Sequence, residues 1–253
     1  VTLNTPMRLD SAMKIIIGLQ TAMYVERDVF KLDDKIGDHL PDFNTPDDEQ
    51  LTFRACHTHC TGIYFPWPLA FANLFYFNTW QESLISHCRR EWPAGAKRRY
   101  GVVGVILSVR ALELYAGKNY WHAMENELFS PLGIKDAQPG GRGFSVEDLA
   151  RLGVLLDNHG KYGKYEFFSE KTYQSILPTQ LSKYFPAVNK TWGIGLKTEN
   201  SLGEGSFGHS GGCGSCLYVN PENHIVFALS RDSMDKNYRK YFSAITSLLK
   251  GIK

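Results

Sequence analysis

The 253-residue chain is predicted to fold as an α+β protein. Up to residue 158, apolar side chains recur mainly at helical spacing. Between residues 192 and 230 they occur in short runs rich in β-branched and aromatic residues, which is typical of strands. Residues 235–249 return to helical spacing. A helical part, then strands, then a covering helix favours an antiparallel sheet packed against helices.

Helices are expected over residues 11–27, 51–59, 80–90, 101–115, 120–128 and 146–158, with a short one between Asp34 and Pro41. The first helix is too apolar for a surface position and is expected to be buried. Gly117 is expected to end the helix before it, Pro131 to break the next, and Ser145 to cap the last. Between them lie an aromatic, proline-containing loop at 64–76 and a glycine-rich crossing at 139–143.

Strands are expected over residues 192–197, 213–219 and 224–230. The last two are joined by Asn220-Pro221-Glu222-Asn223, which is a good turn sequence. The final helix, 235–249, would cover the resulting meander.

The composition excludes several classes of protein. The hydrophobic content of 43% and charged content of 21% are ordinary for a globular domain, and a net charge of +2 gives no reason to expect nucleic acid. No apolar run approaches the roughly 20 residues of a membrane span, and the first residues lack the pattern of a signal peptide. Five cysteines, an odd number, do not suggest a disulfide scaffold.

The first candidate for chemistry is Ser11-Ala12-Met13-Lys14, at the start of the first helix. Residues three apart share a helical face, so the Ser11 hydroxyl and the Lys14 amine can approach each other. A desolvated lysine can take the proton of a serine hydroxyl and make it a nucleophile. The alternative is a purely structural one, a capping serine beside an exposed lysine.

Two further segments are candidates. Tyr100 stands at a loop-to-helix junction next to basic residues, where a tyrosine can shuttle protons, although taken alone it fits a buried aromatic with a satisfied hydroxyl better. His209 begins His209-Ser210-Gly211-Gly212, whose glycines allow a ligand to approach the backbone. The alternative there is a simple cluster of turn glycines.

Together these segments resemble the penicillin-recognising serine hydrolases: class C β-lactamases, D,D-peptidases (D,D-carboxypeptidases) and their esterase relatives. The similar phrases follow in order along nearly the whole chain: Thr5 to Lys14, Lys31 to Ile36 with Leu40 to Phe43, Leu51 to Ile63, Gly117 to Tyr120, Pro131 to Ile134, Phe144 to Arg151, and His209 to Gly211. The resemblance implies a β-lactamase/transpeptidase-like fold. It also implies an α/β lobe of residues 1–14 and 137–253, a helical lobe of residues 15–136, and a site between them.

The resemblance also assigns roles to residues. Ser11 would be the acylated nucleophile and Lys14 its base, and Tyr100 would pass the proton to the leaving group. His209-Ser210-Gly211 falls where the family carries K-T-G or H-x-G, so His209 would stand in for the strand lysine, and Gly211 belongs to the same substrate-facing motif. The N–H groups of Ser11 and Gly212 would form the oxyanion hole.

These roles predict a serine hydrolase that cleaves an ester or amide, such as a D-amino-acid peptide, a β-lactam or a small carboxylic ester. No metal or cofactor is expected, and the partner is a small-molecule substrate. A periplasmic or secreted location is implied by the resemblance alone.

Three departures from the family pattern stand out. Val102 replaces the asparagine of the family's Y-x-N motif, which favours an ester over an amide substrate. The passage from Ile134 to Phe144 is shorter than usual. The family's opening helix and first two strands have no counterpart before Ser11, so an upstream segment or a partner chain would complete the sheet.

Other interpretations stay open. A non-catalytic domain that keeps the fold, with a binding or structural role, is the main alternative. Cys56-His57-Thr58-His59-Cys60 holds four metal-ligand side chains, but only those three or four apart can converge on a helix. The pair Cys213 and Cys216 resembles a redox motif, although two small core residues fit a strand better.

Overall fold

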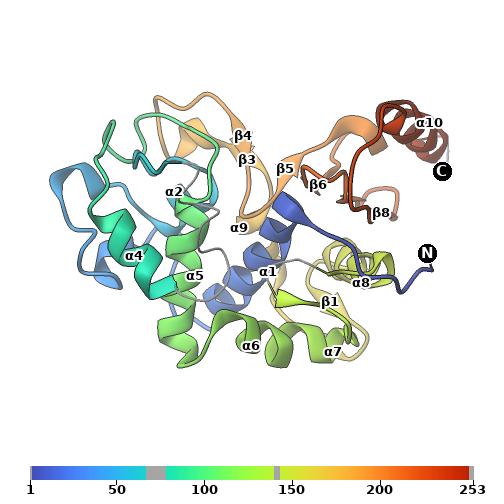
Figure 1. The fold of residues 1–253 in the computed structure, drawn as a ribbon, viewed down its shortest axis with the longest axis horizontal. Coiled ribbons are helices and arrows are strands. Elements are labelled where there is room, and N and C mark those ends of the chain that lie inside the picture. The colour runs from blue at the N-terminus through green and yellow to red at the C-terminus, as the bar shows by residue number, and fades with distance from the viewer. Residues whose placement is uncertain (1, 67–77, 140–142, 251–253) are drawn as a thin grey trace.

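The computed structural model describes residues 2–66, 78–139 and 143–250. The sequence-predicted loop at 64–76 and the glycine-rich crossing at 139–143 therefore lie largely outside the described residues. The α+β class is confirmed, because the structure combines helices with small antiparallel sheets (Figure 1). The division into two lobes at residues 14 and 136 stays a prediction.

Most of the expected helices are present, with small shifts at their ends. The helices are α1 (Met13–Glu26), α2 (Phe53–His57), α4 (Asn78–Ser86), α5 (Val103–Ala116), α6 (Tyr120–Met124), α7 (Ser130–Leu132), α8 (Val146–Asp157), α9 (Glu170–Ile176) and α10 (Tyr238–Lys250). A 3-10 turn, Asp10–Ala12, leads into α1, and only a second such turn, Ile36–Asp38, occupies the short segment before Pro41. The Ser145 hydroxyl accepts the Asp148 N–H as the predicted cap of α8.

The expected break at Pro131 is wrong. A π-helical turn, Glu125–Phe129, joins α6 to α7, and the helical run ends only at Gly133. Pro131 lies at the start of α7, where a missing N–H costs little. Gly133 has a left-handed φ of 71°, which suits glycine and stops the helix.

The main sheet has four antiparallel strands in the order β5-β6-β7-β8. Its strands are β5 (Lys197–Thr198), β6 (Phe207–Ser210), β7 (Cys216–Asn220) and β8 (Ile225–Leu229), and two small hairpins pair β1 (Lys161–Tyr162) with β2 (Tyr165–Glu166) and β3 (Thr179–Gln180) with β4 (Thr191–Trp192). The meander and its covering helix are confirmed, since Phe242 and Leu249 of α10 pack against one face of the sheet. Helix α8 packs against β7 and β8.

The predicted strand 192–197 is corrected. Only its two ends pair as β4 and β5, and residues between them cross over α1. The glycines of this crossing let its backbone approach that of α1 closely, which side chains on a regular strand would prevent.

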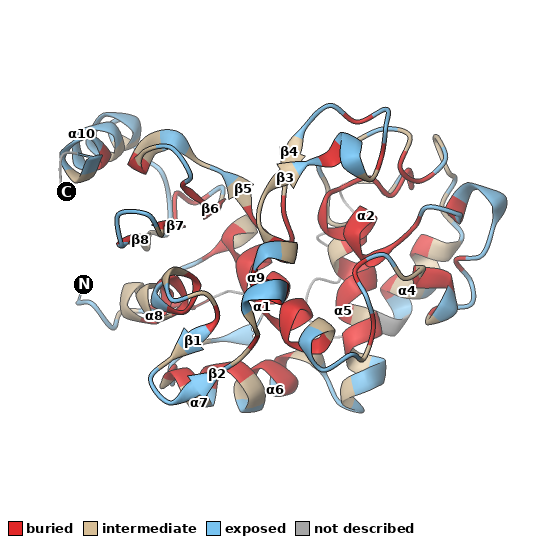
Figure 2. Cartoon of the chain, turned by 180° about the vertical axis from the view of Figure 1, so that it is seen from behind, coloured by how far each residue is buried: buried red, intermediate tan, exposed pale blue. Residues whose placement is uncertain are grey.

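Helix α1 is the structural centre of the molecule. It runs between α2, α4 and α5 on one side and the main sheet on the other (Figure 1). Almost all of it is buried, as the red colouring in Figure 2 shows. The sequence prediction of a buried first helix is confirmed.

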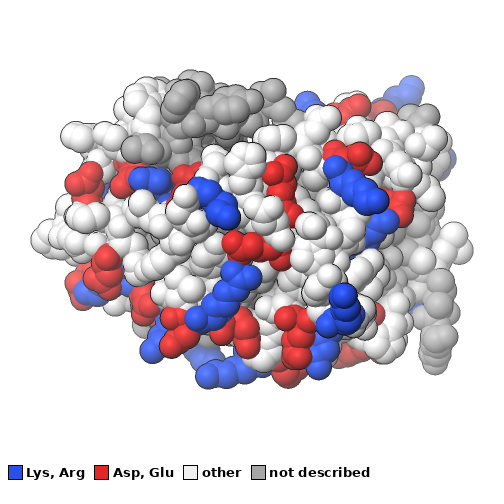
Figure 3. Space-filling view, turned by 90° about the horizontal axis from the view of Figure 1, so that it is seen from below, with Lys and Arg blue, Asp and Glu red and all other residues white. Residues whose placement is uncertain are grey.

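The surface carries charges of both signs. In Figure 3, basic and acidic side chains alternate over the face seen from below, in keeping with the small net charge. No helix of the described residues is long and apolar enough to cross a membrane.

Candidate active site

Ser11 and Lys14 come together at the start of α1. Ser11 lies in the 3-10 turn, and Lys14 follows in the first turn of the helix. The Lys14 Nζ donates to the Ser11 Oγ at 3.3 Å, and the lysine is only 8% exposed. The contact expected from the three-residue spacing is therefore present. The structural alternative, in which the lysine is exposed, is wrong.

The residue before Ser11 has an unusual backbone. Asp10 has a φ of 47°, in the left-handed region that few residues other than glycine, asparagine and aspartate adopt. Its carboxylate accepts from Arg8 at 2.9 Å. This turn fixes the direction in which Ser11 enters the helix.

Glycines hold the other side of α1 close to the crossing segment before β5. A Cβ built on Gly195 would lie 2.1 Å from the carbonyl oxygen of Lys14, and one on Gly18 would lie 2.3 Å from that of Ile194. Real Cβ atoms do not approach an oxygen so closely, so both positions need glycine. The backbone of α1 at Lys14 and Gly18 is thereby held against the segment that leads into β5.

Tyr100 covers the lysine. The Lys14 Nζ lies 5.0 Å from the centre of the Tyr100 ring, within the range of a cation–π contact. Tyr100 is 43% exposed, so one side of the ring faces solvent. The Lys14 amine thus contacts both the Ser11 hydroxyl and the Tyr100 ring.

Three more residues lie around Tyr100, and of these the resemblance placed only His59 near the site, in a structural turn below it. The rings of His59 and Trp192 lie 4.4 and 6.0 Å from that of Tyr100, and the guanidinium of Arg98 stacks 4.0 Å above Trp192. The Gly101 N–H also donates to His59 Nδ1 at 3.5 Å. Arg98 lies two residues before Tyr100, but no pattern in the sequence indicates that Trp192 reaches it.

His209 lies beneath these rings. It is 3% exposed, its ring centre is 6.3 Å from that of Tyr100, and its Nδ1 pairs with the Ser210 carbonyl oxygen at 2.9 Å. Burial, helped by the nearby charge of Lys14, lowers the pKa of His209 to about 3. The imidazole is therefore neutral near pH 7.

The glycines after His209 lie beside the turn that contains Ser11. A Cβ on Gly211 would lie 2.0 Å from the Leu9 carbonyl oxygen, and one on Gly212 would lie 3.4 Å from the Asp10 carboxylate. The Gly211 N–H donates to the Ser215 carbonyl oxygen at 2.8 Å, so this N–H already has a hydrogen-bond acceptor within the turn. Gly212 is exposed.

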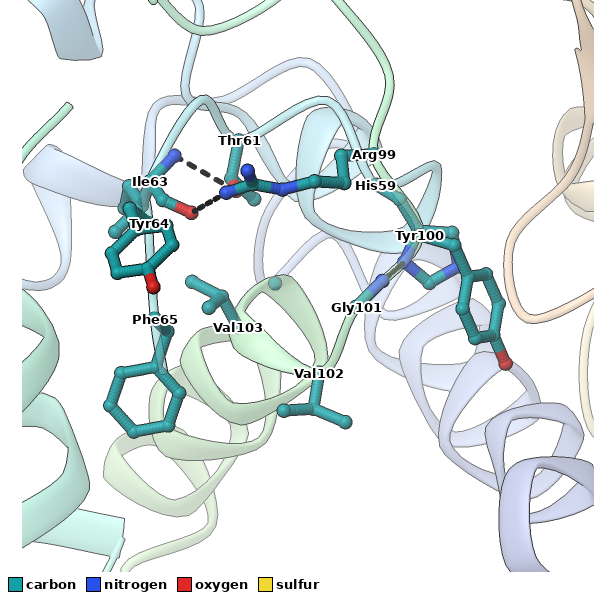
Figure 4. A pocket seen from close by; sticks show the side chains of 11 residues that line it. His59, Thr61, Ile63, Tyr64, Phe65, Arg99, Tyr100, Gly101, Val102 and Val103 are labelled. Carbon is teal, nitrogen blue, oxygen red and sulfur yellow. Dashed lines mark hydrogen bonds between the residues drawn. The ribbon is translucent and has the colours of Figure 1, made fainter. Parts of the chain in front are cut away.

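Val102 lines a cavity beside Tyr100. It is the N-cap residue of α5, and its side chain is half-buried. The cavity has a volume of about 320 Å³ and lies between the start of α5 and the segment around Ile63 (Figure 4). The position that carries an amide in the family's motif therefore presents two methyl groups here.

The histidines and cysteines of residues 56–60 are packed inside the protein. Burial lowers the pKa of His57 to about 3, and its Nε2 pairs with the Thr21 hydroxyl at 3.0 Å. Burial also raises the pKa of the Cys60 thiol. Within the described ranges, no three His, Cys, Asp or Glu side chains converge as metal ligands. The cysteines of this segment and of residues 213–216 are all free.

Comparison with known proteins supports the resemblance seen in the sequence. A family model described as Beta-lactamase matches residues 1–142, which is more than half of the chain. No curated protein matches the sequence.

Solved structures share the fold at low sequence identity. A family VIII carboxylesterase has a TM-score of 0.78 at 14% identity, with 97% of this chain and 83% of that chain covered. The octameric penicillin-binding protein homologue from Pyrococcus abyssi has a TM-score of 0.77 at 22% identity, covering 99% and 67%. A penicillin-binding protein homologue from Caulobacter crescentus has a TM-score of 0.74 at 16% identity, covering 96% and 84%. These likenesses show a shared fold, and the family model that matches more than half of the sequence shows that the chain belongs to the β-lactamase family.

Proposed function

We propose that the protein is a serine hydrolase that cleaves a small carboxylic ester, or an amide, through an acyl-enzyme on Ser11. Membership of the β-lactamase family supports hydrolysis as the general class of reaction. The observation that carries the proposal is the buried amine of Lys14, 3.3 Å from the Ser11 hydroxyl. A serine becomes a useful nucleophile only when a neighbouring group takes its proton.

The proposed reaction has two stages. The Lys14 amine takes the Ser11 proton while Oγ attacks the substrate carbonyl carbon. The Ser11 and Gly212 N–H groups stabilise the oxyanion, and the leaving group departs with a proton passed through Tyr100. Water then attacks the acyl-enzyme, gives up a proton to the same base, and releases the acid with the Ser11 hydroxyl restored.

Val102 and His209 favour an ester within this proposal. Val102 offers no amide to hydrogen-bond the peptide-like group of a peptide or β-lactam. His209 is neutral and buried, so it supplies no cation where a strand lysine would. An ester needs neither contact, and an alkoxide leaves more readily than the nitrogen anion that an amide would have to expel. A carboxylesterase shares the fold, which is compatible with this choice.

Covalent labelling tests the proposal. The protein is incubated with a fluorophosphonate probe, digested and analysed by mass spectrometry, and esterase activity is measured on p-nitrophenyl esters. We expect one adduct, on Ser11, with loss of activity in proportion to labelling. Ser11→Ala should abolish both signals, whereas Ser83→Ala, at an exposed serine of α4, should keep them. A folded protein that shows neither adduct nor turnover would instead be a non-catalytic binding or structural domain.

A further inference from the structure

The ring of Tyr100 is held in place by other rings. It turns away from the cavity beside it (Figure 4), and one side of it faces solvent, so packing on the other side must fix its position. Its ring neighbours are His59, Trp192 and His209, with centres at 4.4, 6.0 and 6.3 Å. These three rings therefore decide whether the tyrosine stays 5.0 Å from the Lys14 Nζ.

Trp192 is the centre of this cluster of rings. It makes edge-to-face contacts with all the others, at interplanar angles of 74° to His59, 67° to Tyr100 and 80° to His209. Aromatic pairs favour this geometry, which fixes the orientation of a ring as well as its distance. A change at Trp192 would therefore loosen every ring contact of Tyr100.

Trp192 also joins the site to the segment that crosses α1. It is the last residue of β4, and from it the chain passes to Gly195, which lies against the Lys14 carbonyl oxygen. The same short segment thus contacts the backbone of Lys14 and, through the indole, the ring of Tyr100. Both groups are placed relative to each other by this segment.

Arg98 holds the indole of Trp192 in turn. The Trp192 Nε1 is buried and has no hydrogen-bond partner among the described residues, so no polar contact fixes the indole. The Arg98 guanidinium lies 4.0 Å from the centre of the indole and donates from Nε to the Thr58 carbonyl oxygen at 3.1 Å. A guanidinium stacked on an indole forms a favourable cation–π contact. Arg98 is therefore the anchor of the tryptophan.

The position of Arg98 costs stability. Its Nη2 is buried without a hydrogen-bond partner in the part of the chain that the structure describes, and burial lowers the pKa of the guanidinium. A cation taken out of water without full hydrogen bonding destabilises a fold. Such costs are typical of residues that serve a functional site.

We infer that Trp192, anchored by Arg98, is a positioning residue that keeps Tyr100 over Lys14 for proton transfer to the leaving group. The inference rests on the proposed function and adds two residues to it. Neither acts on the substrate, because both work through the ring of Tyr100.

Leaving groups test the inference where the protein is active. An alkoxide needs a proton in order to leave, whereas p-nitrophenolate is stable as an anion, so an alkyl ester depends more strongly on Tyr100. We expect Trp192→Leu to lower kcat/KM by roughly 10–100-fold for ethyl acetate but by less than about threefold for p-nitrophenyl acetate, as for a displaced proton donor. Trp192→Phe keeps an aromatic ring and should retain most activity on both esters. Trp80→Leu, at an exposed tryptophan of α4, should leave both values unaltered. An equal loss on both esters in Trp192→Leu would indicate a merely structural role and overturn the inference.

Two further comparisons separate positioning from folding. Arg98→Gln removes the stacked cation and keeps both rings, and it should lower kcat/KM for ethyl acetate in the same selective way. Arg98→Lys should not restore the activity, because an ammonium lacks the flat face that stacks on the indole. In a Tyr100→Phe background, Trp192→Leu should change kcat/KM for ethyl acetate by less than about threefold, since the ring that it positions has lost its hydroxyl. Full activity of Arg98→Gln, or effects of Tyr100→Phe and Trp192→Leu that multiply in full, would contradict the inference.

Fluorine NMR separates this inference from the proposed function, because it needs no turnover. The protein is labelled with 3-fluorotyrosine, and the signal of Tyr100 is identified by its loss in Tyr100→Phe. In Trp192→Leu and in Arg98→Gln the solvent isotope shift of this signal, measured between ordinary and heavy water, should increase because a ring that leaves its packing meets more water. Trp80→Leu should leave the isotope shift unaltered. An increased isotope shift in a protein that no fluorophosphonate labels would support the positioning and contradict the acyl-enzyme. An unaltered isotope shift in both variants of a labelled, active protein would contradict the positioning alone.

Discussion

The amine of Lys14 lies within reach of the two groups on which the proposed reaction depends. It donates to the Ser11 hydroxyl and lies over the ring of Tyr100. An amine in that position can take the proton of the Ser11 hydroxyl and also contact the Tyr100 ring, whereas a permanent cation can only orient these two groups. The distinction between these two roles can be tested with one substitution.

We expect Lys14→Arg to lower kcat/KM for an activated ester by about 10²–10⁴-fold, the usual contribution of a general base. Arginine keeps the positive charge and the stacking on Tyr100, but it stays protonated and cannot accept the Ser11 proton. Lys35→Arg is the matched control, since Lys35 pairs with Glu49 on the surface and arginine can do the same. Loss of less than tenfold in Lys14→Arg would mean that the lysine orients Ser11 without acting as its base.

The residues of the site were only partly predictable from the sequence. Ser11 lies in the 3-10 turn that continues into α1, where Lys14 follows, so their contact is the one expected from helical spacing. The neighbours of Tyr100 come from distant segments, and the approach of Trp192 depends on how the segment before β5 crosses α1. The burial of His209 likewise depends on that packing, so its neutral state could not be inferred from a motif.

Elements were predictable where their own periodicity decided the outcome. Helices α1, α5 and α8 bury one or more faces regularly and end at recognisable residues. The crossing between β4 and β5 was predicted as one strand because its composition is strand-like, but contact with α1 overrides that preference. Pro131 was misjudged because a π-helical turn carries the helical run past it as far as Gly133.

The crossing itself provides a test at the level of elements. We expect Gly195→Ala to lower the free energy of unfolding by about 2–4 kcal/mol. Two effects add, because Gly195 has a left-handed φ of 70° and because a Cβ there would lie 2.1 Å from the Lys14 carbonyl oxygen. Urea unfolding followed by circular dichroism measures the change.

The control for Gly195→Ala is Gly163→Ala. Gly163 also has a positive φ, 56°, but a Cβ there would meet nothing within 4 Å. It should cost only the conformational part, about 1–2 kcal/mol. Equal effects of the two substitutions would mean that α1 and the crossing are not in close contact. Because Lys14 belongs to that contact, Gly195→Ala should also lower ester turnover more than Gly163→Ala does.

Across the whole molecule, the site and the core share the same support. Helix α1 carries Lys14 in its first turn, follows directly on the 3-10 turn that holds Ser11, and buries most of its length in the main hydrophobic cluster. Buried histidines from α2, from the segment after it and from β6 lie around this helix and the site. The protonation of these histidines therefore links the stability of the core to pH.

We expect the free energy of unfolding to fall as the pH drops below about 6.5. Burial lowers the pKa of His57 and of His209 to about 3, and lowers that of His59 well below its usual value. Below pH 6.5 the unfolded chain binds protons at these residues before the folded chain does, so acid favours unfolding, by up to about 1.4 kcal/mol per pH unit for each histidine. Above pH 6.5 all three are neutral in both states and contribute no slope.

Urea unfolding from pH 4.5 to 8 measures this dependence. His57→Gln should reduce the acid slope, while His122→Gln, at an exposed position of α6, should not. The comparison concerns slopes, so it holds even if His57→Gln lowers stability at every pH. An acid slope that His57→Gln leaves unaltered would show that His57 already takes up a proton in the folded protein.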